Sequence, residues 1–368
     1  MENIVILANI EWNFLKQRHQ FLAENLCKRG YNVLFVESAA KRNPGIKDIP
    51  RIINRIKRNL FSNQSKKTDS FNENFNILSP IVFPSTNKFF RFLNNSLFIP
   101  LLNRKISKCL IKSQSTKVIW YAPTSTTSSL IKKMKPQVTI YDCVSNFEAF
   151  TEMPKDTTKI EDELIVQSDC MVVDCDFLYS KHCSKTNNIF LIEPAVDFDL
   201  FSEISKEEME YKIEKVVYYG QLDSLKINIG LINYLIENGI DVHVIGKVTC
   251  HSSEIKAVIH ETVDINQLPE LLREYDALLL PYNLNDYTAG IIPAKFFECF
   301  ATGLPIIATN LLNFKRFQKK MICGDNNEEI LNNIKTFTFN FGKEERIQIA
   351  KDHSWEKFTD KFTDILNP

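Results

Sequence analysis

The strongest constraint on the fold is an alternation of short apolar runs with segments of helical periodicity, which this 368-residue chain contains twice. The first series opens with "NIVILAN" at 3–9, continues with a helix-periodic segment at 14–30, and returns to "YNVLFVE" at 31–37. A continuous apolar run is typical of a strand buried on both faces of a sheet. A strand, a helix and a strand in this order predict a parallel pair joined by a right-handed crossover.

A second alternation starts at "KVVYYG" and continues through "IDVHVIG", "DALLLPY" and "LPIIAT", with helical stretches between them. Two such series predict an α/β fold made of two doubly wound, Rossmann-like domains. We expect an N-terminal domain at 1–205 and a C-terminal domain at 206–352, with the polar stretch 202–215 as a linker or boundary helix. The closing segment 353–368 is expected to form an amphipathic helix, with Trp355, Phe358, Phe362 and Ile365 on one face.

The composition is that of an ordinary globular protein, with 44% hydrophobic and 24% charged residues and no net charge. The nine cysteines form no C-x-x-C pair, and most fall inside apolar segments, which indicates a reducing, cytosolic compartment. We expect no signal peptide, and no apolar run approaches the roughly 20 residues of a membrane span.

Basic charge is concentrated in two N-terminal segments. Residues 41–67 are rich in lysine and arginine with one acid, Asp48, and residues 88–117 contain no acid. In 51–61 and 88–98 the basic residues alternate with Ile, Leu and Phe, which suits an anionic membrane surface. In the other interpretation, the apolar residues belong to the core and the charges form a solvated rim. A nucleic-acid partner is not expected, since the basic runs lack regular aromatic stacking positions.

In open α/β sheets, ligands bind beyond the carboxyl ends of the strands. After "KVVYYG", Gly220 allows the backbone to approach a ligand closely, and Lys226 precedes a helix. A cation beside free N–H groups favours phosphate. The alternative is an ordinary surface lysine.

The stretch after "DALLLPY" has the same character. Small residues at Thr288, Ala289 and Gly290 leave backbone N–H groups uncovered, and Pro293 fits the first turn of the next helix. In that helix, Lys295 and Glu298 lie off the apolar stripe. Glu298 could accept both hydroxyls of a ribose, or the two residues could form a weak surface ion pair.

Several familiar chemistries lack their motifs. There is no G-x-G-x-x-G after the first strand and no G-x-x-x-x-G-K-[ST]. The sequence therefore lacks the main motifs of nicotinamide dehydrogenases and P-loop NTPases. The six histidines form no metal-ligand spacing, and we expect no metal site.

Taken in order along nearly the whole chain, the motifs resemble those of GT-B fold glycosyltransferases of the group 1, family four kind. "PAKFFECFATGLPIIAT" is similar to their "P-x-K-x-x-E-x-x-A-x-G-x-P-V-V" segment, and "YYGQLDSLK" to their "G-x-L-x-x-x-K" loop. "INQLPELLREYDALLLPY", "EPAVDFDLF" and the first strand–helix unit also have counterparts. Among these enzymes the chain is most similar to bacterial polysaccharide enzymes of the teichuronic-acid type.

The resemblance implies two Rossmann-like domains facing across a cleft, with the nucleotide-sugar donor in the C-terminal domain, the acceptor in the N-terminal one, and a final helix crossing back. It implies that Glu298 binds the nucleotide ribose and that Lys226 binds the donor diphosphate. The remaining donor-binding residues would be Gly220, Gln221, Thr288, Ala289, Gly290, Ile291 and Lys295.

The catalytic candidates combine Lys226 with three residues of the N-terminal half. Lys226 would stabilise the leaving diphosphate, where preorganised cations lower the barrier. Arg18 or His19 could add positive charge or a hydrogen bond. Asp142, at the end of "VTIYD", could contact sugar or acceptor, or could instead cap a helix.

Two positions depart from the family pattern. Gly290 stands where these enzymes often have a second glutamate, and Gln221 stands where they have an arginine. These departures keep open a catalytically silent GT-B subunit, and a sugar-nucleotide epimerase is another alternative.

The main prediction is a retaining glycosyltransferase that uses a UDP-sugar as substrate and needs no cofactor. Its acceptor would be a saccharide, lipid-linked in surface polysaccharide synthesis. We expect the protein in the cytoplasm, peripheral to the inner face of the membrane.

Overall fold

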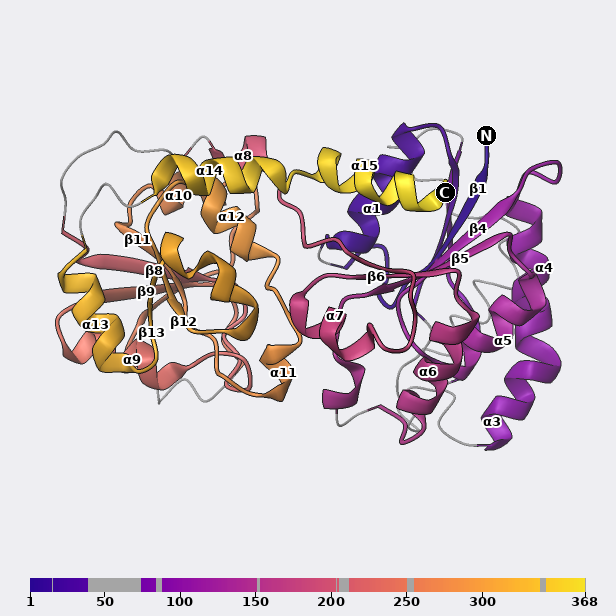
Figure 1. Cartoon of the computed structure of the whole chain (residues 1–368), viewed down its shortest axis with the longest axis horizontal. Helices are drawn as coiled ribbons and strands as arrows, with labels where there is room; N and C mark the ends of the chain where they lie inside the picture. Colours follow the sequence, from indigo (N-terminus) through magenta and orange to yellow (C-terminus); the bar gives the residue numbers. More distant parts are fainter. Residues whose placement is uncertain are drawn as a thin grey trace. The chain divides into compact units, whose positions relative to one another are not determined.

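The computed structural model describes the chain except residues 15, 39–73, 84–87, 151–152, 203, 205–211, 250–254, 338–341 and 368. It consists of two compact units, each built on one parallel sheet (Figure 1). Unit 1 comprises Met1–Ile192 and Thr359–Pro368, and unit 2 comprises Glu193–Phe358. The boundary at Ile192 therefore lies earlier than the expected one at residue 205. Most of the expected linker 202–215 and the basic segment 41–67 lie outside the described residues.

The sheet of unit 1 has seven parallel strands in the order β3-β2-β1-β4-β5-β6-β7. The predicted strand–helix–strand start is confirmed, because β1 pairs in parallel with β2 and every residue of both strands is buried. Its strands are β1 Asn3–Leu7, β2 Asn32–Val36, β3 Phe75–Leu78, β4 Thr116–Trp120, β5 Val138–Cys143, β6 Cys170–Val173 and β7 Ile189–Leu191.

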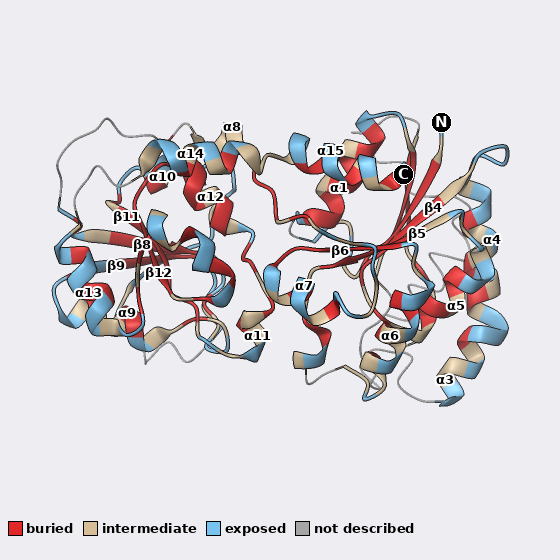
Figure 2. Cartoon of the chain, in the orientation of Figure 1, coloured by how far each residue is buried: buried red, intermediate tan, exposed pale blue. Residues whose placement is uncertain are grey.

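Helices cover both faces of this sheet. Figure 1 shows α1 and α15 on one face and α4, α5 and α6 on the other. Helices α1, α4, α5 and α6 carry both buried and exposed residues, whereas α3 has no buried residue (Figure 2). The helical segments of Unit 1 are α1 Arg18–Lys28, α3 Lys88–Leu93, η2 Asn94–Phe98, α4 Ile99–Cys109, α5 Ser125–Met134, η3 Phe147–Ala149, α6 Thr157–Gln167 and α7 Asp176–His182.

Unit 2 contains six parallel strands in the order β10-β9-β8-β11-β12-β13. The second predicted alternation is confirmed by β8, β9, β11 and β12, whose residues are almost all buried. The strands are β8 Lys215–Tyr219, β9 Asp241–Ile245, β10 Val258–His260, β11 Ala277–Leu280, β12 Ile306–Thr309 and β13 Ile322–Gly324. The helical segments are α8 Phe198–Ser202, α9 Ile229–Glu237, α10 Leu268–Leu272, α11 Asp286–Ala289, α12 Lys295–Ala301, η5 Leu312–Lys320, α13 Asn327–Lys335 and α14 Lys343–Asp352.

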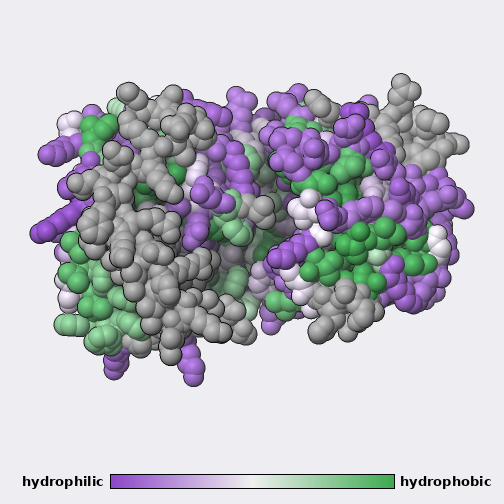
Figure 3. Space-filling view, turned by 180° about the vertical axis from the view of Figure 1, so that it is seen from behind, coloured by the Kyte–Doolittle hydropathy of each residue, from purple (hydrophilic) through white to green (hydrophobic). Residues whose placement is uncertain are grey.

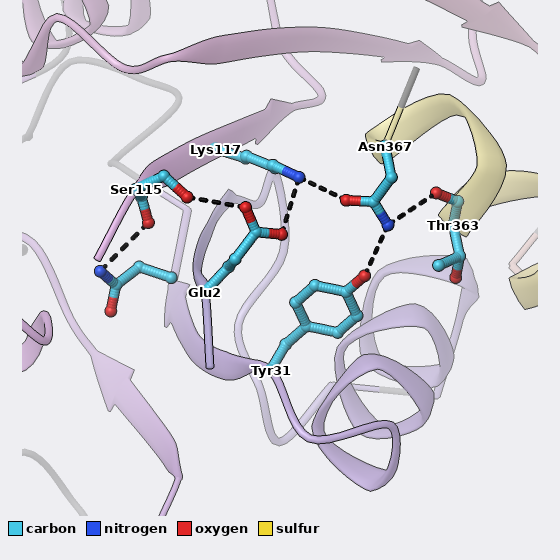
Figure 4. A network of polar contacts seen from close by, with 7 residues as sticks. Glu2, Tyr31, Ser115, Lys117, Thr363 and Asn367 are labelled. Carbon is cyan, nitrogen blue, oxygen red and sulfur yellow. Dashed lines mark hydrogen bonds and ion pairs between the residues drawn. The ribbon is translucent and has the colours of Figure 1, made fainter.

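The last helix, α15 Trp355–Leu366, begins in unit 2, and its residues from Thr359 on belong to unit 1. Phe362 and Leu366 are fully buried, so Leu366 takes the core position that the sequence pattern gave to Ile365. In Figure 4, the amide of Asn367 accepts a hydrogen bond from Lys117 and donates one to the hydroxyl of Tyr31. These contacts anchor the C-terminal end of α15 to unit 1.

None of the helices in the described part of the chain is both long and apolar enough to cross a membrane.

Candidate functional site

The carboxyl end of β8 in unit 2 closes with a glycine turn. Gly220 has φ of +122°, and a Cβ at this position would lie 2.2 Å from the Nζ atom of Lys295. Gly246, after β9, has φ of +145°, and its Cβ would lie 2.2 Å from the carbonyl oxygen of Gly220. Both positions therefore require glycine, because a side chain would collide and a positive φ is unfavourable for other residues. The turns bring Lys295 against the end of β8.

Lys295 is the first residue of α12 and points back to β8 rather than into solvent. Its ammonium group donates a hydrogen bond to the carbonyl of Tyr219. The same group lies 4.2 Å from the ring centre of Tyr218, a favourable cation–π distance. Burial, with a smaller contribution from the positive charge of Lys226, lowers the pKa of Lys295 to about 8, although Cys299 and Glu298 oppose the shift. The site therefore holds a lysine whose charge is poorly compensated by the protein.

Glu298 lies one turn after Lys295 on α12. One of its carboxylate oxygens accepts a hydrogen bond of 3.0 Å from the hydroxyl of Tyr219. Burial raises the pKa of Glu298, and the hydrogen bond from Tyr219 partly offsets this rise. Among the described residues, no ion pair joins Lys295 to Glu298, so the alternative of a surface pair between them is wrong. Both side chains instead contact the tyrosines at the end of β8.

Lys226 lies in the turn between β8 and α9. The turn is held by a hydrogen bond of 2.8 Å from the N–H of Asn283 to the carbonyl of Lys226. The Lys226 ammonium lies 5.6 Å from the ring centre of Tyr287, and no carboxylate pairs with it within the described ranges. Gln221 is exposed beside this turn, and its side-chain amide donates to the hydroxyl of Thr249 at 3.3 Å. Lys226 and Lys295 thus place two positive charges at one end of the sheet.

The loop before α12 is held by hydrogen bonds to Asn285 and Asn313. The side chain of Asn285 caps α11 by accepting a hydrogen bond from the N–H of Thr288. The N–H of Asn285 in turn donates a hydrogen bond to the hydroxyl of Thr288. The side-chain amide of Asn313 donates to the carbonyls of Ala289 and Ile291, at 2.8 and 2.9 Å. The carbonyl oxygens of Ala289 and Ile291 are therefore occupied by the protein itself.

Unlike these carbonyl groups, two N–H groups near the start of α12 have no backbone partner among the described residues. In the part of the chain that the structure describes, the N–H groups of Ile292 and Ala294 donate to no backbone carbonyl. The helix starts at Lys295 with Ala294 as its N-cap, so Pro293 precedes the helix rather than forming its first turn. The N–H groups predicted to be uncovered, those of Thr288, Ala289, Gly290 and Ile291, instead donate to Asn285 and Thr288. The N–H groups open to an anionic ligand are those of Ile292 and Ala294, at the start of α12.

In unit 1, Arg18 and Asp142 form a buried ion pair at the carboxyl edge of the sheet. Two guanidinium nitrogens of Arg18 donate to the two carboxylate oxygens of Asp142, at 2.9 and 2.7 Å. A third donates to the carbonyl of Ile192 at 2.8 Å. Asp142 is fully buried inside β5, so its interpretation as a helix N-cap is wrong. Its carboxylate holds Arg18 in place.

Two further polar residues lie near this ion pair. The ring of His19 lies 3.8 Å from that of Tyr121, centre to centre, beyond the end of β4. Asp174 follows β6 directly, and one of its oxygens is buried without a hydrogen bond from any described residue. Burial raises the pKa of Asp174 to about 7, while the charge of Arg18 opposes this rise. The edge of the sheet therefore carries a carboxyl that titrates near neutrality.

The structure thus groups Gly220, Lys226, Lys295 and Glu298 in unit 2 and places Arg18 and Asp142 in direct contact in unit 1. Sequence reasoning missed Tyr219 and Asp174. Asp174 directly follows an apolar strand, which is the signal that identified Asp142, and the same rule would have found it.

Comparison with solved structures identifies the fold. S. aureus TarM, solved with fondaparinux, α-GlcNAc-glycerol and UDP, matches at a TM-score of 0.58 with 10% identity over all of both chains. Anabaena Alr3699/HepE, in complex with UDP and glucose, matches at 0.64 with 10% identity over 100% of this chain and 99% of that one. WaaG, a glycosyltransferase involved in lipopolysaccharide biosynthesis, matches at 0.62 with 13% identity over 99% of each. The chain has the GT-B fold.

No family model matches the chain. A curated protein of Bacillus subtilis (strain 168), named "Putative teichuronic acid biosynthesis glycosyltransferase TuaH", is 30% identical over 59 residues. The matched stretch covers 16% of this chain and 15% of that protein.

Proposed function

We propose that the protein is a glycosyltransferase that moves a sugar from a nucleotide diphosphate sugar to a saccharide acceptor. The observation that carries the proposal is the grouping of Lys226, Lys295 and Glu298 around Gly220 in unit 2. Two cations and a carboxylate at the end of a parallel sheet match the charges of a diphosphate and the hydroxyls of a ribose.

In this proposal Glu298 accepts hydrogen bonds from the two ribose hydroxyls. Lys226 and Lys295 bind the diphosphate, and the N–H groups of Ile292 and Ala294 add donors. A UDP-sugar is the proposed donor, since the TarM and Alr3699/HepE structures were solved with UDP. The donor is a substrate, and we propose that no cofactor is needed because lysines and N–H donors stabilise the leaving diphosphate.

Unit 1 is the proposed acceptor side. Arg18 is fixed by Asp142 and offers a buried positive charge at the sheet edge, with His19 beside it. We propose transfer with retention of configuration, in which the leaving phosphate helps to deprotonate the acceptor hydroxyl. Asp142 acts in this scheme by positioning Arg18, because its own carboxylate has no exposed surface.

The proposed acceptor is lipid-linked, in the synthesis of a bacterial surface polysaccharide. The similarity to the teichuronic acid protein supports this substrate class. The segment from α3 to α4 exposes Phe89, Phe92, Leu97 and Leu101 next to basic side chains. Figure 3 shows hydrophobic side chains over this edge of unit 1, at its lower left. Phe89 and Phe92, which are 67% and 69% exposed, are not core residues.

This surface favours peripheral attachment to the anionic inner face of the cytoplasmic membrane. The test is co-sedimentation with anionic vesicles, comparing wild type with a Phe89→Ser, Phe92→Ser double variant. Val166→Ser is the control, since Val166 is an exposed apolar residue on α6 of the same unit. Binding that the double variant loses and the control keeps would support attachment. Equal sedimentation of all three proteins would contradict it.

The donor proposal is tested by thermal unfolding with UDP, GDP, CMP and dTDP. A ligand that binds only the folded state stabilises it by about 2.7 kcal/mol at 100 times its Kd. We expect one nucleoside diphosphate to stabilise wild type and an exposed-site control, Glu344→Ala, but not Glu298→Ala. If no nucleotide stabilises wild type, the silent subunit becomes the better explanation, supported by Gln221 and Gly290. Release of free sugar from the donor, lost in Lys226→Ala, would then separate an active enzyme from a silent one.

A further inference from the structure

Three potential metal ligands converge inside unit 1, away from the proposed donor site. Cys143 is the last residue of β5, Glu161 lies in the middle of α6, and His182 is the last residue of α7. One ligand atom from each lies within 4.8 Å of the others. The three residues are far apart in sequence, and only the fold brings them together.

All three side chains are buried, with 0% of Cys143 and 1% each of Glu161 and His182 exposed. The Nδ1 atom of His182 makes no hydrogen bond to any described residue. The thiol of Cys143 donates a hydrogen bond of 3.6 Å to the carbonyl of Ser145 and also interacts with the hydroxyl of Tyr141. A buried imidazole nitrogen without a partner is costly, because it has lost water and gained nothing in return.

The ligand chemistry of the cluster suits a cation. A neutral imidazole has a lone pair on one ring nitrogen, and the Nδ1 atom of His182 has no hydrogen-bond partner among the described residues. A divalent cation would compensate one carboxylate and one thiolate and leave the buried group neutral overall.

We propose that Cys143, Glu161 and His182 bind a zinc ion that fastens α6 and α7 to the end of β5. Thiolate, imidazole and carboxylate are the ligands that Zn²⁺ takes in proteins. The ligand atoms around a tetrahedral zinc lie roughly 3–4 Å apart, so the side chains close by about 1 Å on binding. Water is the fourth ligand. The thiol of Cys143 loses its proton to solvent as the sulfur–zinc bond forms, and no oxidation occurs.

The surroundings of the cluster fit this role. The hydroxyl of Tyr141 donates a hydrogen bond to Glu161, the outer contact that a ligating carboxylate usually has. Tyr141 is itself held by stacking on Trp120, with ring centres 3.7 Å apart. Asp142 directly precedes Cys143, so the ion would also fix the strand end that positions Arg18.

The test is the metal content of the full chain, purified without chelator and without a nickel column. We expect about one zinc per chain in wild type and in Cys183→Ser, and a loss of most of it in Cys143→Ser and His182→Gln. Cys183 is the matched control because it is an exposed thiol next to His182 and the more accessible site for adventitious zinc. Removing zinc with a chelator should lower the Tm of wild type, and adding zinc back should restore it.

Cobalt titration gives a second measurement. It uses wild-type protein and therefore does not require that a variant lacking a metal ligand still folds. Cobalt bound by Cys143 in chelator-treated wild type should produce a thiolate-to-metal absorption in the near ultraviolet. Wild type that carries no zinc, shows no such absorption and gains no stability from added zinc would overturn the proposal. Equal zinc in wild type and His182→Gln would also overturn it, by assigning the ion to another site. Neither the metal content nor the cobalt absorption depends on nucleotide binding by unit 2, so the zinc proposal can fail independently of the proposed function.

Discussion

The hydroxyl of Tyr219 donates a hydrogen bond of 3.0 Å to Glu298, joining the end of β8 to the first turns of α12. This contact orients the carboxylate proposed to bind ribose. We expect Tyr219→Phe to fold normally and to weaken nucleotide diphosphate binding about two- to fivefold, the usual worth of one such hydrogen bond. Calorimetric titration measures it, with Tyr234→Phe on α9 as the control. An unchanged Kd in Tyr219→Phe would show that Glu298 does not need this orientation.

The charge of Lys295 predicts a pH dependence of donor binding. The pKa of this lysine is lowered from 10.5 to about 8, so the ammonium loses its proton as pH rises through 8. Affinity for a nucleotide diphosphate should therefore fall above about pH 8. Lys295→Gln should bind more weakly below pH 8 and lose this decline. A wild-type Kd that stays constant from pH 7 to pH 9.5 would contradict the assignment.

The lowered pKa of Lys295 also affects stability, which should rise with pH where the affinity for a nucleotide diphosphate falls. Between about pH 8 and 10.5, the unfolded chain holds a proton on Lys295 that the folded chain lacks. The contribution of this residue to the free energy of unfolding therefore rises with pH across that interval. Denaturant unfolding of wild type and Lys295→Met at several pH values measures it. The variant should lack this rise.

The two glycines of unit 2 should differ in what their substitution damages. An added Cβ at Gly246 meets backbone atoms of Gly220, which cannot move aside, whereas one at Gly220 meets the flexible end of Lys295. Gly246→Ala should lower the free energy of unfolding by at least about 2 kcal/mol. Gly220→Ala should destabilise less but displace Lys295 and weaken nucleotide binding. Urea unfolding and nucleotide titration of both variants measure these two effects. A larger loss of stability in Gly220→Ala than in Gly246→Ala would contradict this account.

The two sheets could be predicted from the sequence because buried parallel strands have continuous apolar sequences, as in β1 and β8. Sequence reasoning located Lys226 in the loop after β8 and Glu298 in the helix that follows β11, since both assignments need only chain order. It misplaced the domain boundary, because Glu193 follows the last strand of unit 1 yet pairs with Arg316 and His353 of unit 2. That contact depends on tertiary packing and leaves no local pattern.

The cluster of three residues proposed to bind zinc had no sequence signal for a related reason. Cys143, Glu161 and His182 show none of the short spacings by which metal sites are recognised in sequences. Their convergence depends on the packing of α6 and α7 against β5. The side-chain directions of Lys295 and Glu298 were equally inaccessible, since helical spacing permits an ion pair between them and only the tyrosines of β8 decide otherwise.

The ion pair of Arg18 and Asp142 predicts strong coupling between the two residues. Arg18→Ala leaves a buried carboxylate without its cation and should cost about 3–5 kcal/mol of unfolding free energy. Adding Asp142→Asn removes that charge, so the double variant should be more stable than Arg18→Ala alone. Urea unfolding of wild type, both single variants and the double variant gives the coupling energy. Additive losses would mean that the two side chains do not depend on each other.

Asp174 should make unit 1 less stable as pH rises from 4 to 7. Its pKa is raised from 3.8 to about 7, so across this range the folded chain keeps a proton that the unfolded chain has lost. Stability from this group is complete below pH 4 and is lost as pH rises through 7. Asp174→Asn removes the titration and should exceed wild type by a few kcal/mol, in order of magnitude, at pH 8 while matching it at pH 4. Asp364→Asn, at an exposed position on α15, should follow wild type at both pH values. Parallel stability curves for wild type and Asp174→Asn would show that Asp174 is ionised in the folded protein throughout.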